Sequence, residues 1–177
     1  MSLEFTHTRL KKPCKDTHQW PPYRALWDKY GDPDAAFDPF ARDCRWCSPW
    51  TNDISPDTGA EYNMDAEEFL TLIEDRRGLE SMQVGLLDPP FSDRMSSDRY
   101  GTGNLYASDS GKITRIQKQM GNLIKPGGIL IKAGYNTSKP HPSFELEEIV
   151  LVTMGPVQAD VIFSIWRKTI PNIERWQ

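Results

Sequence analysis

A strand that ends in Asp88-Pro89-Pro90-Phe91 is the part of this sequence whose residue types could do chemistry. Residues 84–87 are apolar or small and predict a buried strand, and two successive prolines cannot continue the hydrogen-bond ladder of a sheet. A carboxylate, a proline carbonyl and an aromatic ring are therefore gathered at the carboxyl end of a strand. Open α/β sheets bind their ligands at that end.

This set of groups suits transfer to the exocyclic amine of a nucleic-acid base, whose lone pair is delocalised into the ring. The Asp88 carboxylate and the Pro89 carbonyl can accept the two N–H bonds and favour the nucleophilic form of the amine. The Phe91 ring can stack on a base that has left its helix. Taken alone, the same four residues also fit a strand that ends in a proline turn with an exposed Asp.

Other short segments that contain acids precede this strand in a fixed order. They are Phe37-Asp38-Pro39-Phe40, then Asp53-Ile54, then Asp65-Ala66. Downstream, residues 123–131 predict a helix end, a Pro-Gly-Gly turn and a second buried strand. Each acid taken singly could be a helix cap or a turn residue, but four in this order are harder to explain that way.

This ordered set resembles the class I S-adenosylmethionine-dependent methyltransferases, specifically the amino-methyltransferases of DNA and, among them, the small viral and phage-type members. The resemblance spans about residues 35–168. It implies an α/β, three-layer Rossmann-like fold with a mostly parallel seven-stranded sheet and an antiparallel final strand. It also implies S-adenosylmethionine as cofactor and Asp88, Pro89, Pro90 and Phe91 as the catalytic motif.

The resemblance also implies cofactor contacts at individual positions. Phe37-Asp38-Pro39-Phe40 matches the first motif, which surrounds the methionine part of the cofactor. Asp53 matches the acid that binds the ribose hydroxyls, with Ile54 beside the adenine ring. Asp65-Ala66 matches the acidic position whose side chain meets the adenine amino group.

One departure from the family concerns the loop after Asp38. The family usually has glycines there, whereas this chain has Ala41-Arg42-Asp43-Cys44-Arg45. A side chain in place of glycine restricts the loop and disfavours a left-handed backbone conformation. Arg42 or Arg45 could instead reach the cofactor carboxylate. The departure favours an alternative, a catalytically inactive nucleic-acid-binding or partner-binding protein of the same fold.

The distribution of charge predicts where nucleic acid would bind. The net charge is −4, yet residues 28–88 hold 15 acids and 5 bases, whereas residues 89–139 hold 8 bases and 3 acids. A basic stretch after the catalytic strand suits phosphate binding, although it could also be the solvated face of a helix over residues 110–122. The predicted nucleic-acid contacts are Arg94, Arg99, Lys112, Arg115 and Lys118.

Periodicity and composition predict one domain with a short arm. Residues 1–20 are polar and lack clear periodicity, which predicts an amino-terminal arm, and residues 21–177 form a single methyltransferase-like domain. Helices are expected over residues 21–30, 65–77 and 110–122. Strands are expected over 129–133 and, as a final antiparallel pair, over 144–153 and 157–166.

Cysteine content does not predict a metal. An odd count of three thiols, in a protein expected to be intracellular, argues against a disulfide framework. Cys44 and Cys47, with Cys14 and His18, could supply four zinc ligands, but free buried cysteines are commoner, so no metal is assigned.

The sequence therefore predicts an S-adenosylmethionine-dependent methyltransferase that acts on the exocyclic amine of adenine in DNA. Alternatives are the same chemistry on the cytosine 4-amino group or on RNA, and a methyltransferase of small-molecule or protein amines. Target choice is expected to rest on a loop over residues 92–108, on the amino-terminal arm or on a partner, either a second copy of the chain or a separate specificity subunit. No apolar run approaches the roughly 20 residues of a membrane span, and a cytoplasmic location, host cytoplasm for a viral protein, is expected.

Overall fold

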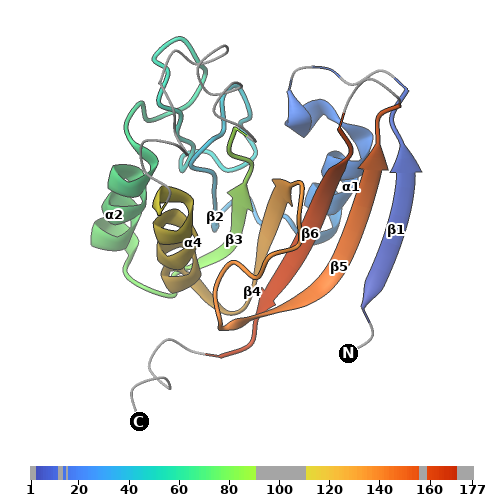
Figure 1. Ribbon diagram of the computed structural model, residues 1–177. Helices are drawn as coiled ribbons and strands as arrows, with labels where there is room; N and C mark the ends of the chain where they lie inside the picture. The colour runs from blue at the N-terminus through green and yellow to red at the C-terminus, as the bar shows by residue number, and fades with distance from the viewer. Residues whose placement is uncertain (1–2, 12–13, 15, 91–110, 156–158, 171–177) are drawn as a thin grey trace.

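A mixed sheet of six strands lies at the centre of the computed structural model, in the order β1-β5-β6-β4-β3-β2 (Figure 1). The structure describes residues 3–11, 14, 16–90, 111–155 and 159–170. The strands are β1 (Glu4–Arg9), β2 (Ala36–Phe37), β3 (Met82–Leu87), β4 (Ile124–Gly134), β5 (Phe144–Thr153) and β6 (Val161–Lys168). The helices within these ranges are the 3-10 helix η1 (Thr17–Gln19), α1 (Pro21–Tyr30), α2 (Ala66–Arg77) and α4 (Lys112–Leu123).

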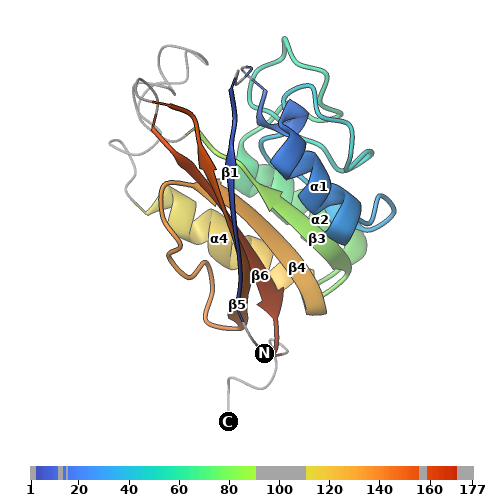
Figure 2. The same ribbon diagram turned by 90° about the vertical axis from the view of Figure 1, so that its right-hand side faces the viewer.

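Strand β3 lies next to the edge strand β2 and is buried on both faces of the sheet. It pairs in parallel with β2 on one side and with β4 on the other. Val84 and Leu86 pack in a cluster with residues of α1, whereas Leu87 packs in a second cluster with residues of α2 and α4. Figure 2 shows α1 and α4 on opposite faces of the sheet. A strand covered on both faces is apolar along its length, which is the pattern that predicted it.

Strand directions agree with the fold expected from the sequence. Strand β6 lies between β4 and β5 and is antiparallel to both, whereas β2, β3 and β4 are parallel to one another. The mostly parallel sheet with an antiparallel final strand is therefore confirmed. The last strand begins at Val161 and ends at Lys168, a few residues later than predicted.

The expected number of seven strands is not found among the described residues, which form six. Beyond β2 the sheet continues only as two isolated parallel bridges, Asp38 to Thr51 and Asn52 to Tyr62. The segments between these bridges are too short for a crossover helix, so the chain crosses this edge of the sheet without forming regular strands. The two outer strand positions of the expected fold are thus reduced to single contacts.

The amino-terminal segment differs from the expected arm. Residues Glu4–Arg9 form β1, which pairs in parallel with β5 at the edge of the sheet from Glu4 opposite Glu148 to Arg9 opposite Thr153. Nearly all of its side chains are exposed. An edge strand without a buried face has no reason to show a period of two, which explains why the sequence pattern did not reveal it.

Helix α2 has capping residues at both ends. Asp65 caps α2, its carboxylate accepting a hydrogen bond from the Glu67 N–H at 2.9 Å, and Gly78 ends this helix with a φ of 84°. The predicted helix over residues 110–122 is confirmed as α4, which buries Ile116 and Met120. Strand β4 starts directly after α4 at Ile124, so the predicted Pro-Gly-Gly turn lies within its first residues.

None of the helices in the described ranges is long and apolar enough to cross a membrane.

We expect Gly128→Ala to lower the free energy of unfolding by about 1–3 kcal/mol, because overpacking must displace backbone. A Cβ atom at this position would lie 2.7 Å from the carbonyl oxygen of Gln83 and 2.6 Å from Cγ2 of Ile124. Gly134 lies on the same strand and has nothing within 4 Å of such an atom. Urea unfolding of Gly134→Ala should therefore match the wild type, and equal losses in both variants would contradict this packing.

Candidate functional site

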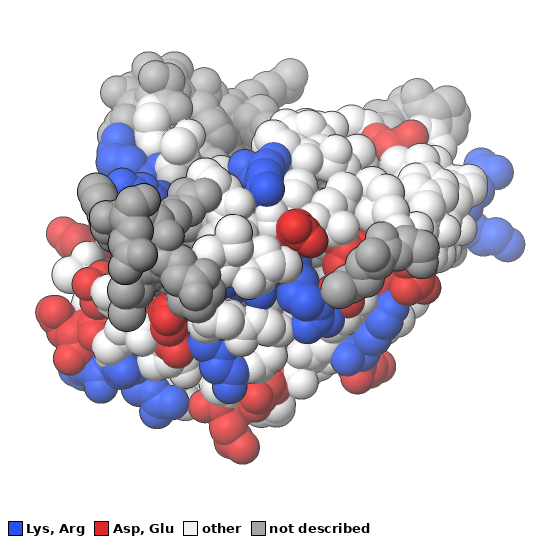
Figure 3. Space-filling model, turned by 90° about the horizontal axis from the view of Figure 1, so that it is seen from below, with Lys and Arg blue, Asp and Glu red and all other residues white. Residues whose placement is uncertain are grey.

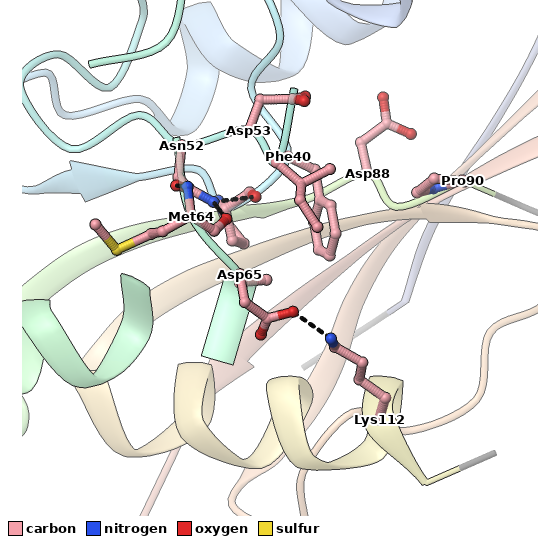
Figure 4. A pocket seen from close by; sticks show the side chains of 11 residues that line it. Phe40, Asn52, Asp53, Met64, Asp65, Asp88, Pro90 and Lys112 are labelled. Atoms are coloured by element: carbon pink, nitrogen blue, oxygen red, sulfur yellow. Dashed lines mark hydrogen bonds and ion pairs between the residues drawn. The ribbon is translucent and has the colours of Figure 1, made fainter. Parts of the chain in front are cut away.

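A pocket opens where β2 and β3 end, at the carboxyl edge of the sheet. The space between its lining residues is about 490 Å³, which includes open solvent at the mouth. Figure 4 shows Asp53 and Asp88 at one end of the pocket and Asp65 with Lys112 at the other. The lining residues are Pro39, Phe40, Asn52, Asp53, Ile54, Met64, Asp65, Ala66, Asp88, Pro90 and Lys112.

Asn52 holds together the wall of the pocket that follows β2. Its side-chain amide donates to the carbonyl oxygens of Pro39 at 3.2 Å and Met64 at 3.0 Å, and its oxygen accepts from the Met64 N–H at 3.1 Å. The residue is buried, so these three bonds replace contacts with water. The sequence analysis did not single out Asn52. Its one signal in the sequence is its place between Thr51 and Asp53, directly before a predicted cofactor residue.

Asp53 is a buried carboxylate at the end of the same segment. Burial raises its pKa, while the N–H groups of Ser55 and Arg42 and the Arg42 charge act in the opposite direction. The Ser55 N–H donates to Oδ1 of Asp53 at 2.9 Å. Next to it, Ile54 is 44% exposed, an apolar side chain left open beside the pocket.

Asp88 follows β3, and its side chain continues the alternation of Val84 and Leu86 toward the α1 face. Burial raises the pKa of Asp88 to about 6, although a hydrogen bond from the Thr17 side chain and the charge of Arg42 lower it. The helix η1, which carries Thr17, thus contacts the residue predicted to be catalytic. The sequence analysis assigned no role to Thr17, because nothing in a polar amino-terminal segment marks one hydroxyl among several.

Asp38 does not line the pocket and is almost fully buried. Its Oδ1 accepts from the Phe40 N–H at 2.9 Å. Burial and the neighbouring Asp88 and Asp53 carboxylates raise the pKa of Asp38 well above its usual range. Three acids with raised pKa values therefore lie together at this edge, as expected where carboxylates are desolvated in a group.

The glycine-free loop after Asp38 adopts a left-handed conformation in spite of its side chains. Arg42 has a φ of 50°, so the absence of glycine does not block the conformation, contrary to the expectation from the sequence. The Arg42 guanidinium lies 3.3 Å from the Asp16 carboxylate, and Arg45 pairs with Glu61 at 2.5 Å. Neither arginine is among the lining residues.

Most of the predicted cofactor and catalytic positions meet in this one pocket. Phe37, Asp38 and Pro89 are buried but are not among its lining residues. Phe91, Arg94 and Arg99 lie outside the described residues. The predicted residues that line the pocket are Pro39, Phe40, Asp53, Ile54, Asp65, Ala66, Asp88 and Pro90, together with Lys112 from the predicted nucleic-acid set.

Two of the bases predicted to bind nucleic acid are paired with acids at the amino end of α2. Lys112 forms an ion pair with Asp65, and Arg115 pairs with Glu67, its Nε lying 2.7 Å from the carboxylate. Lys118 is exposed on α4. The face of the molecule at the amino ends of the parallel strands carries acidic and basic side chains intermixed (Figure 3).

The cysteines give no indication of a metal centre. No group of three or more His, Cys, Asp or Glu side chains within the described ranges is placed to hold a metal ion. Cys44 and Cys47 are buried, and burial raises the pKa of Cys44 to about 12, which keeps its thiol protonated and unreactive. Cys14 is exposed, and its Sγ lies 3.4 Å from the carbonyl oxygen of Asp16.

Solved structures of other proteins share this fold. The protein PH0851 is 15% identical over 78% of this chain with a TM-score of 0.51, and this chain spans only 43% of its length. The N-methyltransferase NodS from Bradyrhizobium japonicum WM9 is 10% identical, with 83% and 92% of the two chains covered and a TM-score of 0.53. YhhF from Escherichia coli, a candidate methyltransferase, is 12% identical, with 90% and 89% covered and a TM-score of 0.52.

These comparisons place the chain in a fold class. At identities of 10–15% the likeness concerns the fold alone. The α/β fold of this chain, with a mixed six-stranded sheet among the described residues, matches the fold of the methyltransferase neighbours NodS and YhhF. No protein-family model matches the chain, and no curated protein matches its sequence.

Asp88→Asn is expected to raise the free energy of unfolding at pH 8 by up to about 3 kcal/mol. This is the cost of ionising, in the folded chain, a carboxyl whose pKa is raised from 3.8 to about 6. The wild-type carboxyl, with its pKa raised to about 6, favours the folded state while protonated, and this stabilisation is lost as the pH rises through about 4 to 6. The variant should therefore gain little at pH 4 and most above pH 7. Urea unfolding across this pH range measures the difference, and the exposed Asp57→Asn serves as control. A gain that does not depend on pH would contradict the raised pKa.

Proposed function

We propose that this chain is an S-adenosylmethionine-dependent methyltransferase that acts on the exocyclic amine of adenine in DNA. The observation that carries the proposal is the meeting of two sets of residues in one pocket. Asp53 and Asp65 are acceptors suited to a nucleoside, and Asp88 and Pro90 line the pocket beside them, directly after β3. In sequence these residues lie far apart, so their convergence is not a consequence of their spacing.

The donors and acceptors of the pocket fit the proposed cofactor. The Asp53 carboxylate suits ribose hydroxyls, and the exposed Ile54 and the partly buried Phe40 offer apolar surface to a purine ring. Three carboxylates and one ammonium line the pocket, a balance that favours a positively charged ligand. S-adenosylmethionine supplies, when bound, a transferable methyl group on a sulfonium.

Asp88 has the properties that an acceptor for the target amine needs. It is partly desolvated, so a hydrogen bond to its carboxylate is stronger than in water. With a pKa of about 6 it is largely ionised at neutral pH and can accept an N–H bond. The Pro89 carbonyl is the second acceptor in this proposal. Because both are held at the end of a buried strand, little reorganisation accompanies the reaction.

The proposal that DNA is the substrate rests on two features of the sequence. One is the order of the motifs, which resembles that of DNA amino-methyltransferases, and the other is the basic stretch after β3. The exposed Lys118 is a described member of that stretch. The same geometry accommodates a cytosine amine or RNA, and methyl transfer to each is the measurement that separates them. The inactive alternative depended on the missing glycines, and the left-handed Arg42 weakens that argument.

Calorimetric titration with S-adenosylhomocysteine should detect binding in the micromolar range by the wild type. We expect Asp53→Ala to weaken this binding at least tenfold, because a buried acceptor of the ribose is removed. Asp57→Ala, in the same loop but exposed, is the matched control. A folded wild type that binds neither S-adenosylhomocysteine nor S-adenosylmethionine would contradict the proposed function.

Asp88→Ala should lower the rate of tritiated methyl transfer to DNA by about two to three orders of magnitude, the effect of removing a preorganised acceptor. Its affinity for the cofactor should stay within about twofold of the wild type. The wild-type rate should rise with pH through about pH 6, where Asp88 ionises. Equal losses of rate and of cofactor affinity would instead assign Asp88 a structural role.

A further inference from the structure

We infer that Lys112 is a specificity-determining residue that, together with Asp65, recognises the edge of a 6-aminopurine in the pocket. This inference rests on the proposed cofactor site and adds a donor to it. Lys112 is the first residue of α4, and its side chain reaches the pocket wall formed at the start of α2. Figure 4 shows its ammonium directed at the Asp65 carboxylate, with which it forms an ion pair.

The Asp65 carboxylate can accept a further hydrogen bond while it is paired. Its Oδ1 accepts from the Glu67 N–H at 2.9 Å, which fixes the orientation of the carboxylate plane. Its Oδ2 contacts Lys112. A carboxylate offers about four lone-pair sites, so this pairing leaves acceptor capacity for an amino group of a ligand. Side-chain exposures of 27% for Asp65 and 18% for Lys112 place both groups at the boundary between pocket and protein.

Helix stability does not explain a lysine at this position. The amino terminus of a helix carries partial positive charge, so a cation in the first turn of α4 is unfavourable. Nor is Lys112 needed to join α4 to α2. Arg115, one turn later, makes two hydrogen bonds to Glu67, at 2.7 and 3.1 Å. The buried Ile116 and Phe69 of the two helices also pack in one cluster.

A carboxylate beside an ammonium is complementary to adenine on chemical grounds. Adenine presents its N6 amino donor next to a ring-nitrogen acceptor, N7 on one edge and N1 on the other. Asp65 can accept from the amino group while Lys112 donates to the adjacent ring nitrogen. A 6-oxopurine presents an acceptor where adenine has a donor, and leaves Asp65 facing that oxygen. A site built for a hydrogen bond strongly rejects an analogue that cannot make it.

Chemical substitution of the ligand tests Lys112 separately from Asp65. The ligands are S-adenosylhomocysteine and its 1-deaza and 7-deaza adenine analogues, which retain the amino group and each lack one ring acceptor. We expect the wild type to bind one of the two analogues about tenfold more weakly than the parent. Lys112→Met should bind parent and analogue equally, because the donor that distinguishes them is gone. Calorimetry measures all affinities, and circular dichroism verifies that the variant is folded.

Arg115→Met is the matched control, because it removes a neighbouring ion pair that is not in the pocket lining. It should retain the wild-type preference between the ligands. The inference is overturned where Lys112→Met keeps the preference, where neither analogue binds the wild type more weakly, or where Lys112→Met binds the parent more tightly. That last result would show that Lys112 competes with the cofactor for Asp65. Failure of the wild type to bind S-adenosylhomocysteine at all would contradict the proposed function instead.

Discussion

Burial of β3 on both faces, followed by its forced exit from the sheet at Pro89, is the constraint on which the site depends. The apolar contacts of Val84 and Leu86 with α1, and of Leu87 with the α2–α4 side, hold the strand in place. Prolines then prevent the chain from continuing the ladder. Asp88 is consequently placed at the boundary between the core and the pocket, where it is desolvated enough for its pKa to rise and open enough to contact a ligand.

The same edge of the sheet collects carboxylates at a cost in stability. Asp38, Asp53 and Asp88 all have pKa values raised by burial, so each is less favourable as an anion in the folded chain than in water. Backbone N–H groups of the tight loops offset part of this cost, as the Phe40 and Ser55 N–H groups do for two of the acids. Carboxyl groups whose pKa values are raised by burial are typical of functional sites rather than of residues that only support the fold.

Prediction from sequence succeeded where burial imposes a period or a cap has a fixed chemistry. The apolar run of residues 84–87 and the helix expected over residues 65–77 each have a local cause, and they were located correctly as β3 and α2. Strand β1 and the count of six strands among the described residues were not predicted. An exposed edge strand has no alternation of apolar and polar residues, and an isolated bridge such as Asn52 to Tyr62 leaves no strand pattern in the sequence. The roles of Asn52 and Thr17 depend on partners distant in sequence, which no local pattern reveals. Most cofactor positions were identified through the resemblance, and their convergence in one pocket required the structure.

The contacts between α2 and α4 are apolar along one part of the helices and charged along the other, and the charged part adjoins the pocket. Deeper in the molecule the two helices meet through apolar side chains, whereas at their amino ends they meet through Asp65 with Lys112 and Glu67 with Arg115. Charged contacts near solvent are individually weak, and their groups keep donor or acceptor capacity for a ligand, whereas apolar contacts in the core offer none. The apolar contacts therefore hold the two helices together, while the charged groups at their amino ends can make additional contacts with a bound molecule. Because Asp65 also caps α2, a ligand that donates a hydrogen bond to this carboxylate acts directly on the charge balance at the start of that helix.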